Sequence, residues 1–174
     1  MSSINYNLSL IKGLALDVDG VLSTSTIPLS PDGEPLRMVS TKDGYALQLA
    51  VRKGLHIAII TGGKSENVRV RFASLGIKEI YLGASRKLPV LQEWMNKFGL
   101  QPHEVAFMGD DIPDLPCLKY VGLSCAPKDA AWEVKNISAY ISKVNGGHGC
   151  VRDVLEQIMK AKGLWLSDED AFGW

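Results

Sequence analysis

Residues 11–22 read Ile-Lys-Gly-Leu-Ala-Leu-Asp-Val-Asp-Gly-Val-Leu. The apolar run predicts a buried strand, and it ends in Asp17 and Asp19, two carboxylates that a chain rarely places against a hydrophobic core. Because side chains alternate along a strand, both carboxylates point to one side and Val18 points to the other. Gly20 then allows a sharp turn. Two like charges this close need a shared proton or a cation, so this stretch indicates a functional site.

Length and charge are those of one globular domain. The chain has 174 residues, which is enough to bury a full hydrophobic core, and we expect 1–174 to form a single domain. Its 19 basic and 19 acidic residues balance, which leaves no electrostatic footprint for nucleic acid or an anionic membrane. We therefore expect neither of these partners.

The cysteines and the N-terminal residues predict a cellular compartment. The three cysteines are odd in number and lack Cys-x-x-Cys spacing, which argues against a disulfide framework or a zinc cage: Cys117, Cys125 and Cys150. Buried thiols in a reducing compartment fit this pattern. Residues 1–7 have no basic leader, and no apolar run reaches membrane-spanning length. We predict a cytoplasmic protein.

The rest of the chain alternates between helix and strand patterns. Residues 23–40 carry three prolines and an Asp-Gly turn, which predict a β-hairpin projecting after the first strand. Thr41 is the expected N-cap of the next helix. Helices are expected over 42–53, 65–75, 87–98, 130–135 and 151–162, strands over 56–60, 80–82, 105–108, 121–124 and 139–141, and a tail over 163–174. This order predicts an α/β fold with a doubly wound, mainly parallel, Rossmann-like sheet.

Polar side chains stand at the ends of several expected strands. Thr61 follows the second strand, Lys87 comes after the third, and an acidic cluster follows the fourth: Asp110, Asp111 and Asp114. In a doubly wound sheet these ends converge on one crevice together with the first acidic pair. A crevice lined by carboxylates suits Mg²⁺, whereas the absence of His and Cys from the motifs argues against zinc.

These motifs, in this order, resemble those of the haloacid dehalogenase superfamily of phosphohydrolases: Asp17-Val18-Asp19-Gly20-Val21, Thr61, Lys87 and Gly109-Asp110-Asp111-x-x-Asp114. The resemblance implies that Asp17 attacks phosphorus to form an aspartyl phosphate while Asp19 acts first as acid and then as base. It implies that Mg²⁺ is held by Asp17, Asp110 and the backbone carbonyl of Asp19. It also implies that the phosphoryl oxygens are bound by three residues, Thr61, Gly62 and Lys87, and that Asp111 and Asp114 orient the metal ligands or pair with Lys87.

The lengths of the segments between the motifs indicate how open the active site is to substrate. Neither 20–60 nor 62–86 is long enough for a cap domain, so we expect an open active site. Further stretches resemble the capless family that hydrolyses 3-deoxy-D-manno-octulosonate 8-phosphate in lipopolysaccharide synthesis, among them Lys42-Asp43-Gly44-Tyr45 and Gly146-Gly147-x-Gly149-x-Val151-Arg152-Asp153. That resemblance implies a homotetramer in which the hairpin and the tail of one subunit approach a neighbouring active site. It also implies that Arg71 contacts the sugar carboxylate.

Two positions depart from that family's pattern, and other functions stay open. Gly63 stands where the resemblance implies a charged side chain, and His148 stands where it implies Arg. A related nine-carbon 2-keto-3-deoxy sugar acid 9-phosphate is therefore an alternative substrate. A phospho-accepting regulatory module is an alternative of another class, although its acidic residues should all precede the Thr. A nucleotide-binding P-loop at Gly63-Lys64-Ser65 is not supported, because the glycine it requires is replaced by Ala58.

Overall fold

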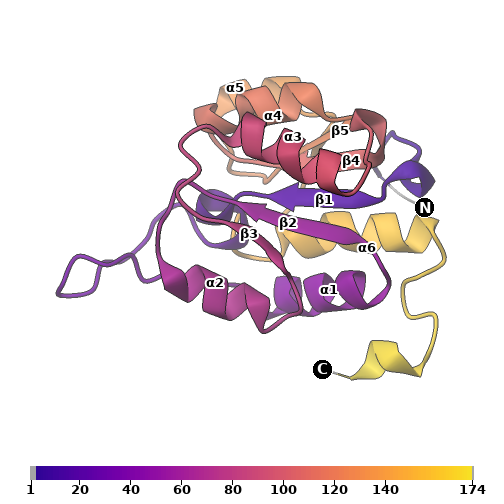
Figure 1. Cartoon of the computed structure of the whole chain (residues 1–174), viewed down its shortest axis with the longest axis horizontal. Helices are drawn as coiled ribbons and strands as arrows, with labels where there is room; N and C mark the ends of the chain where they lie inside the picture. The colour runs from indigo at the N-terminus through magenta and orange to yellow at the C-terminus, as the bar shows by residue number, and fades with distance from the viewer. Residues whose placement is uncertain (1–2, 174) are drawn as a thin grey trace.

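A parallel sheet forms the centre of the fold in the computed structural model, which describes residues 3–173. Its six strands lie in the order β3-β2-β1-β4-β5-β6, and every pairing is parallel. The strands are β1 (Gly13–Leu16), β2 (His56–Ile60), β3 (Glu79–Tyr81), β4 (Val105–Met108), β5 (Leu123–Ala126) and β6 (Tyr140–Ile141). Figure 1 shows the sheet between two layers of helices, so the predicted doubly wound α/β fold is confirmed.

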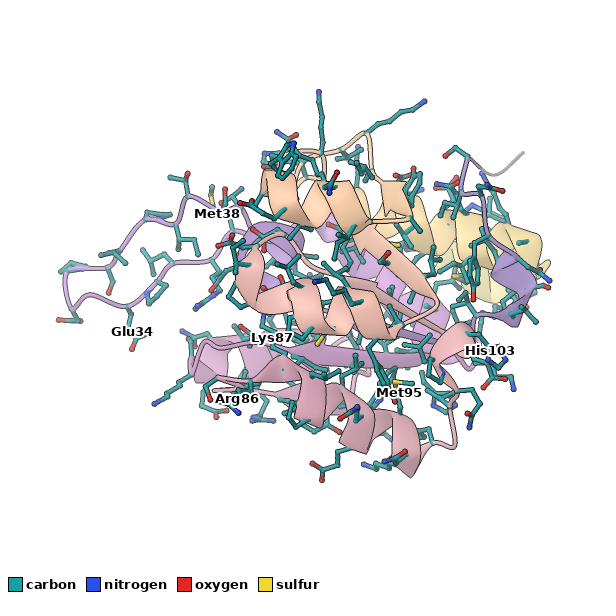
Figure 2. The ribbon with its side chains drawn as sticks, turned by 90° about the horizontal axis from the view of Figure 1, so that it is seen from above. Glu34, Met38, Arg86, Lys87, Met95 and His103 are labelled. Atoms are coloured by element: carbon teal, nitrogen blue, oxygen red, sulfur yellow. The ribbon has the colours of Figure 1, made fainter. Side chains whose placement is uncertain are left out.

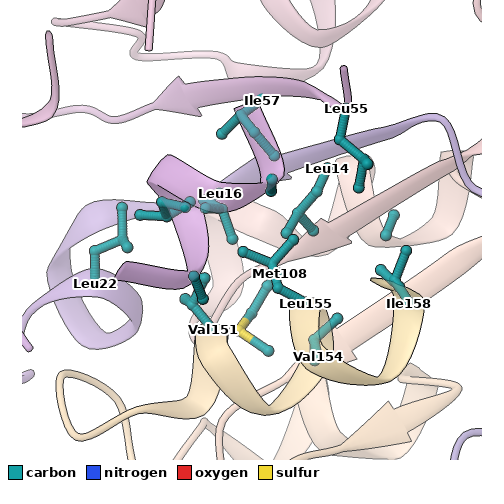
Figure 3. Close-up of a cluster of buried hydrophobic side chains, with 14 of the residues drawn as sticks. Leu14, Leu16, Leu22, Leu55, Ile57, Met108, Val151, Val154, Leu155 and Ile158 are labelled. Carbon is teal, nitrogen blue, oxygen red and sulfur yellow. The ribbon is translucent and has the colours of Figure 1, made fainter. Parts of the chain in front are cut away.

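The two faces of the sheet are covered by different helices. Figure 1 shows one face under α1 (Thr41–Arg52), α2 (Glu66–Ala73) and α6 (Cys150–Ala161), and the other under α3 (Lys87–Lys97), α4 (Leu115–Tyr120) and α5 (Trp132–Ile137). A hydrophobic core lies on each face of the sheet, and successive strand residues point into the two cores alternately. Leu14 and Leu16 pack toward α6, whereas Ala15 packs toward α3. Figure 3 shows the first core, in which the apolar stripe of α6 meets β1 and β4. Burial of both faces fixes the strand register and hence the strand ends.

Residues 23–40, called the arm below, project beyond the sheet (Figure 1). Two isolated antiparallel bridges, Ser23 with Val39 and Leu29 with Pro35, join its two sides, and the amide of Leu36 donates to the carbonyl of Pro28 at 2.8 Å. The arm is therefore hairpin-like without a regular ladder. Proline supplies no amide hydrogen, so three prolines in this segment prevent continuous pairing.

The expected elements match the structure closely except at four places. The β2 and β4 strands have the expected bounds, but β5 spans Leu123–Ala126 instead of 121–124, and α5 begins at Trp132 instead of 130. Ser40, not Thr41, is the N-cap of α1, since its hydroxyl accepts the amide of Asp43 at 3.3 Å. The short helix α4 had no predicted counterpart. Its six residues include a proline, too few to display a helical period.

The intervals between the motifs hold only parts of the core fold. The segment from Asp19 to Thr61 contains the arm, α1 and β2, and the segment from Thr61 to Lys87 contains α2 and β3. The tail packs on its own chain: Trp165 meets the ring of Tyr45 edge to face, and Lys53 pairs with Asp168. Figure 1 places this tail beneath α1 and α6, away from the arm. Within residues 3–173, no helix is both long and apolar enough to cross a membrane.

Candidate active site

Asp17 stands where β1 gives way to the tight turn η2 (Val18–Leu22). The side chain is nearly buried, and its Oδ1 accepts the amide of Val18 at 2.7 Å. The turn is possible because Gly20 has φ of +82°, in the left-handed region that favours glycine. The sheet therefore holds a nearly buried carboxylate at the carboxyl ends of β1 and β4, the edge at which ligands bind in open α/β sheets.

Lys87, the first residue of α3, bridges two buried carboxylates. Its Nζ lies 2.6 Å from Oδ2 of Asp17 and 2.7 Å from Oδ1 of Asp114. The second oxygen of Asp114 accepts the backbone amides of Asp110 and Asp111, at 3.0 and 3.4 Å. Figure 2 shows Lys87 at the end of the molecule nearer the arm, with His103 at the opposite end. The expected pairing of Asp114 with Lys87 is present, and through Lys87 it ties the acidic loop to Asp17.

The charges of this cluster do not balance within the chain. Burial, and after it the charge of Asp114, raises the pKa of Asp17 to about 7 despite the opposing effect of Lys87. Burial, followed by Asp17 and Asp114, raises the pKa of Asp110 to about 7. Burial lowers the pKa of Lys87, but the two carboxylates that it touches outweigh burial and raise it. Lys87 thus stays charged, and a further cation is needed to keep every carboxylate ionised.

Asp110 completes an oxygen-rich site that suits Mg²⁺. One oxygen from each of Asp17, Asp110 and Asp114 lies within 4.8 Å of the other two. Among residues 3–173, no donor hydrogen-bonds the Asp110 carboxylate. A Cβ on Gly20 would stand 1.9 Å from Oδ2 of Asp110, so the glycine lets this carboxylate approach the turn. Because Asp114 is fully buried behind Lys87, Asp17 and Asp110 are the carboxylates that fit a hard divalent cation.

Thr61 and the residues after it form the adjacent loop, at the end of β2. The Thr61 hydroxyl accepts the amide of Gly63 at 3.1 Å, and its backbone is fixed by hydrogen bonds with Tyr81 and Ala84. Gly62 is exposed at the top of this loop. A hydroxyl and backbone amides held beside Lys87 and Asp17 by neighbouring strands are suited to anion binding.

Asp19 has a partner that its sequence motif does not predict. Arg37, from the arm, binds its carboxylate with two contacts, Nε to Oδ1 at 2.7 Å and Nη2 to Oδ2 at 2.9 Å. The same guanidinium lies against Gly63, because a Cβ added there would stand 2.9 Å from Nη2 of Arg37. The family pattern implies a charged side chain at position 63. No signal in the local sequence distinguishes Arg37, because the arm has neither a regular period nor a motif.

A groove of about 280 Å³ lies beside this ion pair, between the arm and α2, and is lined by Pro35, Leu36, Arg37, Met38, Val39, Ser65, Asn67, Val68, Arg71 and Phe72. Arg71 reaches across to α1, since a Cβ on Gly44 would stand 3.0 Å from its Nη2. Two arginines and an apolar wall suit a small anionic ligand.

Two of the named positions lie at the edge of the site. The Asp111 side chain is exposed, and its backbone amide is held by Asp114. His148 is exposed on the loop before α6, where its Nδ1 lies 2.7 Å from the carbonyl of Gly146. That loop packs on the turn η2, because the amide of Gly147 donates to the carbonyl of Val21 at 2.8 Å.

At its strand ends, the parallel sheet carries an Asp-x-Asp turn, a threonine, a buried lysine and an acidic loop. This combination defines a haloacid dehalogenase-like hydrolase. The model of that family matches residues 76–154. The curated 3-deoxy-D-manno-octulosonate 8-phosphate phosphatase of Escherichia coli K12 is 39% identical over 153 residues, covering 88% of this chain and 81% of the relative. This chain belongs to the 3-deoxy-D-manno-octulosonate 8-phosphate phosphatase family of haloacid dehalogenase-like hydrolases.

Solved structures agree with this assignment. The phosphatase of the same description from Yersinia pestis superposes with a TM-score of 0.87 at 35% identity, covering 91% of this chain and 85% of that chain. The Moraxella catarrhalis phosphatase, solved with a magnesium ion, a phosphate ion and a KDO molecule, also has a TM-score of 0.87 at 35% identity, over 95% and 93% of the two chains. The predicted family is confirmed.

Proposed function

We propose that this chain hydrolyses 3-deoxy-D-manno-octulosonate 8-phosphate to the free sugar acid and phosphate, with Mg²⁺ as its cofactor. The observation that carries the proposal is the buried Lys87–Asp17 pair beside Asp110, found in a chain 39% identical to a curated phosphatase of this substrate. The release of this sugar acid belongs to lipopolysaccharide synthesis. The whole chain, 1–174, acts in this proposal as one catalytic domain, with the arm as an insert and the tail as an appendage.

The chemistry proceeds in two displacements. Asp17 attacks phosphorus, the bond to the sugar oxygen breaks, and Asp19 gives its proton to that oxygen. The Asp19 carboxylate then takes a proton from water, the water oxygen attacks phosphorus, and the bond to Asp17 breaks to release phosphate. Asp19 serves as acid and then as base, so it is protonated again at the end of each turnover.

The surrounding residues hold the reacting groups. Lys87 fixes Oδ2 of Asp17 and, with the Thr61 hydroxyl and the amide of Gly62, binds phosphoryl oxygens. Asp114 holds Lys87 in place, and Asp111 lies at the rim of the acidic loop. Mg²⁺, held by Asp17, Asp110 and the backbone carbonyl of Asp19, supplies positive charge to the phosphoryl oxygens. The charge imbalance among the carboxylates supports this assignment.

Substrate choice is assigned to the groove between the arm and α2. Arg71 lies along this groove, and we assign the sugar carboxylate to it because a guanidinium binds a carboxylate through two parallel hydrogen bonds. Gly63 and His148 remove two charged side chains from the family pattern, so the nine-carbon 9-phosphate is the competing substrate.

The assembly proposed here is a homotetramer in which the arm and tail of one subunit approach a neighbour's active site. Leu29 and Met38 support it, because both are exposed on the arm of a single chain. A cytoplasmic location is also proposed, and the three buried free thiols support a reducing compartment. Light scattering of the purified protein tests the assembly, and a monomer at micromolar concentration would contradict it.

The test of substrate is a comparison of kcat/KM for the eight-carbon 8-phosphate and the nine-carbon 9-phosphate in the presence of Mg²⁺. We expect a strong preference for the eight-carbon substrate. A preference for the nine-carbon substrate would replace the assignment within the same chemistry. At most one phosphate released per chain would favour a phospho-accepting regulatory module instead.

A further inference from the structure

Arg37 is an unusual residue for an exposed arm, because its side chain is almost completely buried. Only 9% of the Arg37 side chain is exposed, compared with 38% of the Asp19 side chain that it binds. Both carboxylate oxygens of Asp19 are held, at 2.7 and 2.9 Å, by the two nitrogens of one guanidinium edge. The hydroxyl of Ser23 adds a longer contact to Oδ1, at 3.3 Å. A planar fork of this kind fixes the plane of the carboxylate as well as its position.

The guanidinium of Arg37 occupies a space that the chain leaves open at Gly63. A Cβ on Gly63 would stand 2.9 Å from Nη2 of Arg37 and 3.4 Å from the Thr61 hydroxyl. The backbone of Gly63 does not require glycine, because its φ is not among the positive values. The lack of a side chain at Gly63 therefore leaves space for the guanidinium. Arg37 thus lies against the loop proposed to bind phosphate, and the nitrogen nearest Gly63, Nη2, is one of the two that bind Asp19.

From this geometry we infer that Arg37 is a positioning residue, which holds the Asp19 carboxyl in the plane from which its proton reaches the leaving oxygen. The inference rests on the proposed function, in which Asp19 is the acid and base. The ion pair in this structure corresponds to the state that Asp19 reaches once its proton has been given to the sugar oxygen. Arg37 acts through Asp19. The absence of a side chain at Gly63 leaves the space that the Arg37 guanidinium occupies.

The leaving group distinguishes this role from a structural one. A sugar alkoxide needs a proton as its bond to phosphorus breaks, whereas p-nitrophenolate needs almost none. We expect Arg37→Gln to lower kcat/KM for the sugar phosphate by about 10- to 100-fold through kcat, with KM changed less than about threefold. The loss in kcat/KM with p-nitrophenyl phosphate, which reports only the first displacement, is expected to stay below about threefold.

A double-mutant cycle tests the space at Gly63. Gly63→Ala would make the guanidinium shift to relieve a 2.9 Å contact, so it should lower kcat for the sugar phosphate in the wild-type background, by less than Arg37→Gln does, and have no further effect in the Arg37→Gln background. Arg69→Gln, which removes an exposed arginine of α2 paired with Glu66, is the matched control and should leave kcat unchanged. Should Arg37→Gln fail to fold, Gly63→Ala still crowds a guanidinium that remains in the chain.

Three results would overturn the inference. Equal losses in kcat/KM with both leaving groups would indicate a structural role. An increase in KM alone would make Arg37 a substrate-binding residue, and additive effects of the two substitutions would mean that Gly63 is not the space for Arg37. A wild-type protein that is inactive on the eight-carbon substrate but hydrolyses other sugar phosphates would refute the proposed substrate alone, and the cycle can then be measured with those esters.

Discussion

The ammonium of Lys87 lies 2.6 Å from Oδ2 of Asp17, and both side chains are nearly buried. The Asp17 carboxylate is therefore held in one orientation by a neighbouring charge, as the proposed nucleophile should be. The same contact makes Lys87 necessary for stability, because its loss leaves two carboxylates buried without a counter-charge.

Lys87→Met is therefore expected to destabilise the metal-free protein by about 3–5 kcal/mol, the cost of breaking a buried ion pair. The loss should be larger at pH 8 than at pH 6, since Asp17, whose pKa burial raises to about 7, is ionised at the higher pH. Urea unfolding with a chelator present measures both values. Lys97→Met, which removes an exposed pair with Glu79 on the same helix, should cost no more than about 1 kcal/mol. Equal losses for the two substitutions would contradict the account.

Magnesium should stabilise the protein in a pH-dependent manner. The pKa values of Asp17 and Asp110 rise from 3.8 to about 7 on folding without metal, so the folded state binds more protons between these values. The free energy of unfolding of the metal-free protein therefore falls as pH rises from about 4 to about 7. Since Mg²⁺ binds the ionised carboxylates, its stabilising effect should be greater at pH 8 than at pH 6. Thermal unfolding with Mg²⁺ and with chelator measures the difference, and an identical shift at both pH values would refute the prediction.

Gly20→Ala should abolish most of the Mg²⁺-dependent activity, by about 100-fold or more, because the new Cβ displaces Asp110. Gly54, which follows α1, offers a matched control. Its φ of +83° is nearly the same, but a Cβ added there would have no atom within 4 Å, so Gly54→Ala carries the same backbone strain, about 1–2 kcal/mol, without touching the site. Steady-state kinetics of the two variants gives the comparison. Similar activities in both would show that backbone strain alone matters.

Arg71→Gln should raise KM for the sugar acid phosphate by about 10- to 100-fold, the loss expected for one charged hydrogen-bonding partner. An aryl phosphate has no carboxylate, so its KM should not change. The exposed arginine variant Arg69→Gln is expected to match the wild type with both substrates. An equal effect of Arg71→Gln on the two substrates would mean that Arg71 supports the helix and not the ligand.

The sheet was predictable because its strands are short apolar runs bounded by glycine or acidic residues, as in residues 13–19 and 105–110. Local patterns of this kind also place Asp17, Lys87 and Asp110 at strand and helix ends, from which the convergence of these three residues follows. The bounds of β5 and the helix α4 were not predictable, because elements of four and six residues are set by packing against their neighbours.

The contact between Arg37 and Asp19 could not be predicted for a different reason. It joins the arm to the first turn, and the path of the arm depends on bridges such as Ser23 with Val39, which no local pattern specifies. The sequence does not predict the space at Gly63 either. It shows only that glycine replaces the charged residue of the family pattern, and not that Arg37 fills the space. Long-range contacts made by an irregular segment require the folded structure.

The most direct test of the central claim is phosphate release from 3-deoxy-D-manno-octulosonate 8-phosphate by the wild type and by Asp17→Asn, with and without Mg²⁺. The account predicts many turnovers per chain for the wild type with Mg²⁺, a loss of at least about a thousandfold in the variant, and unchanged folding by circular dichroism. Equal rates for the two proteins, or wild-type turnover that persists in chelator, would contradict the account.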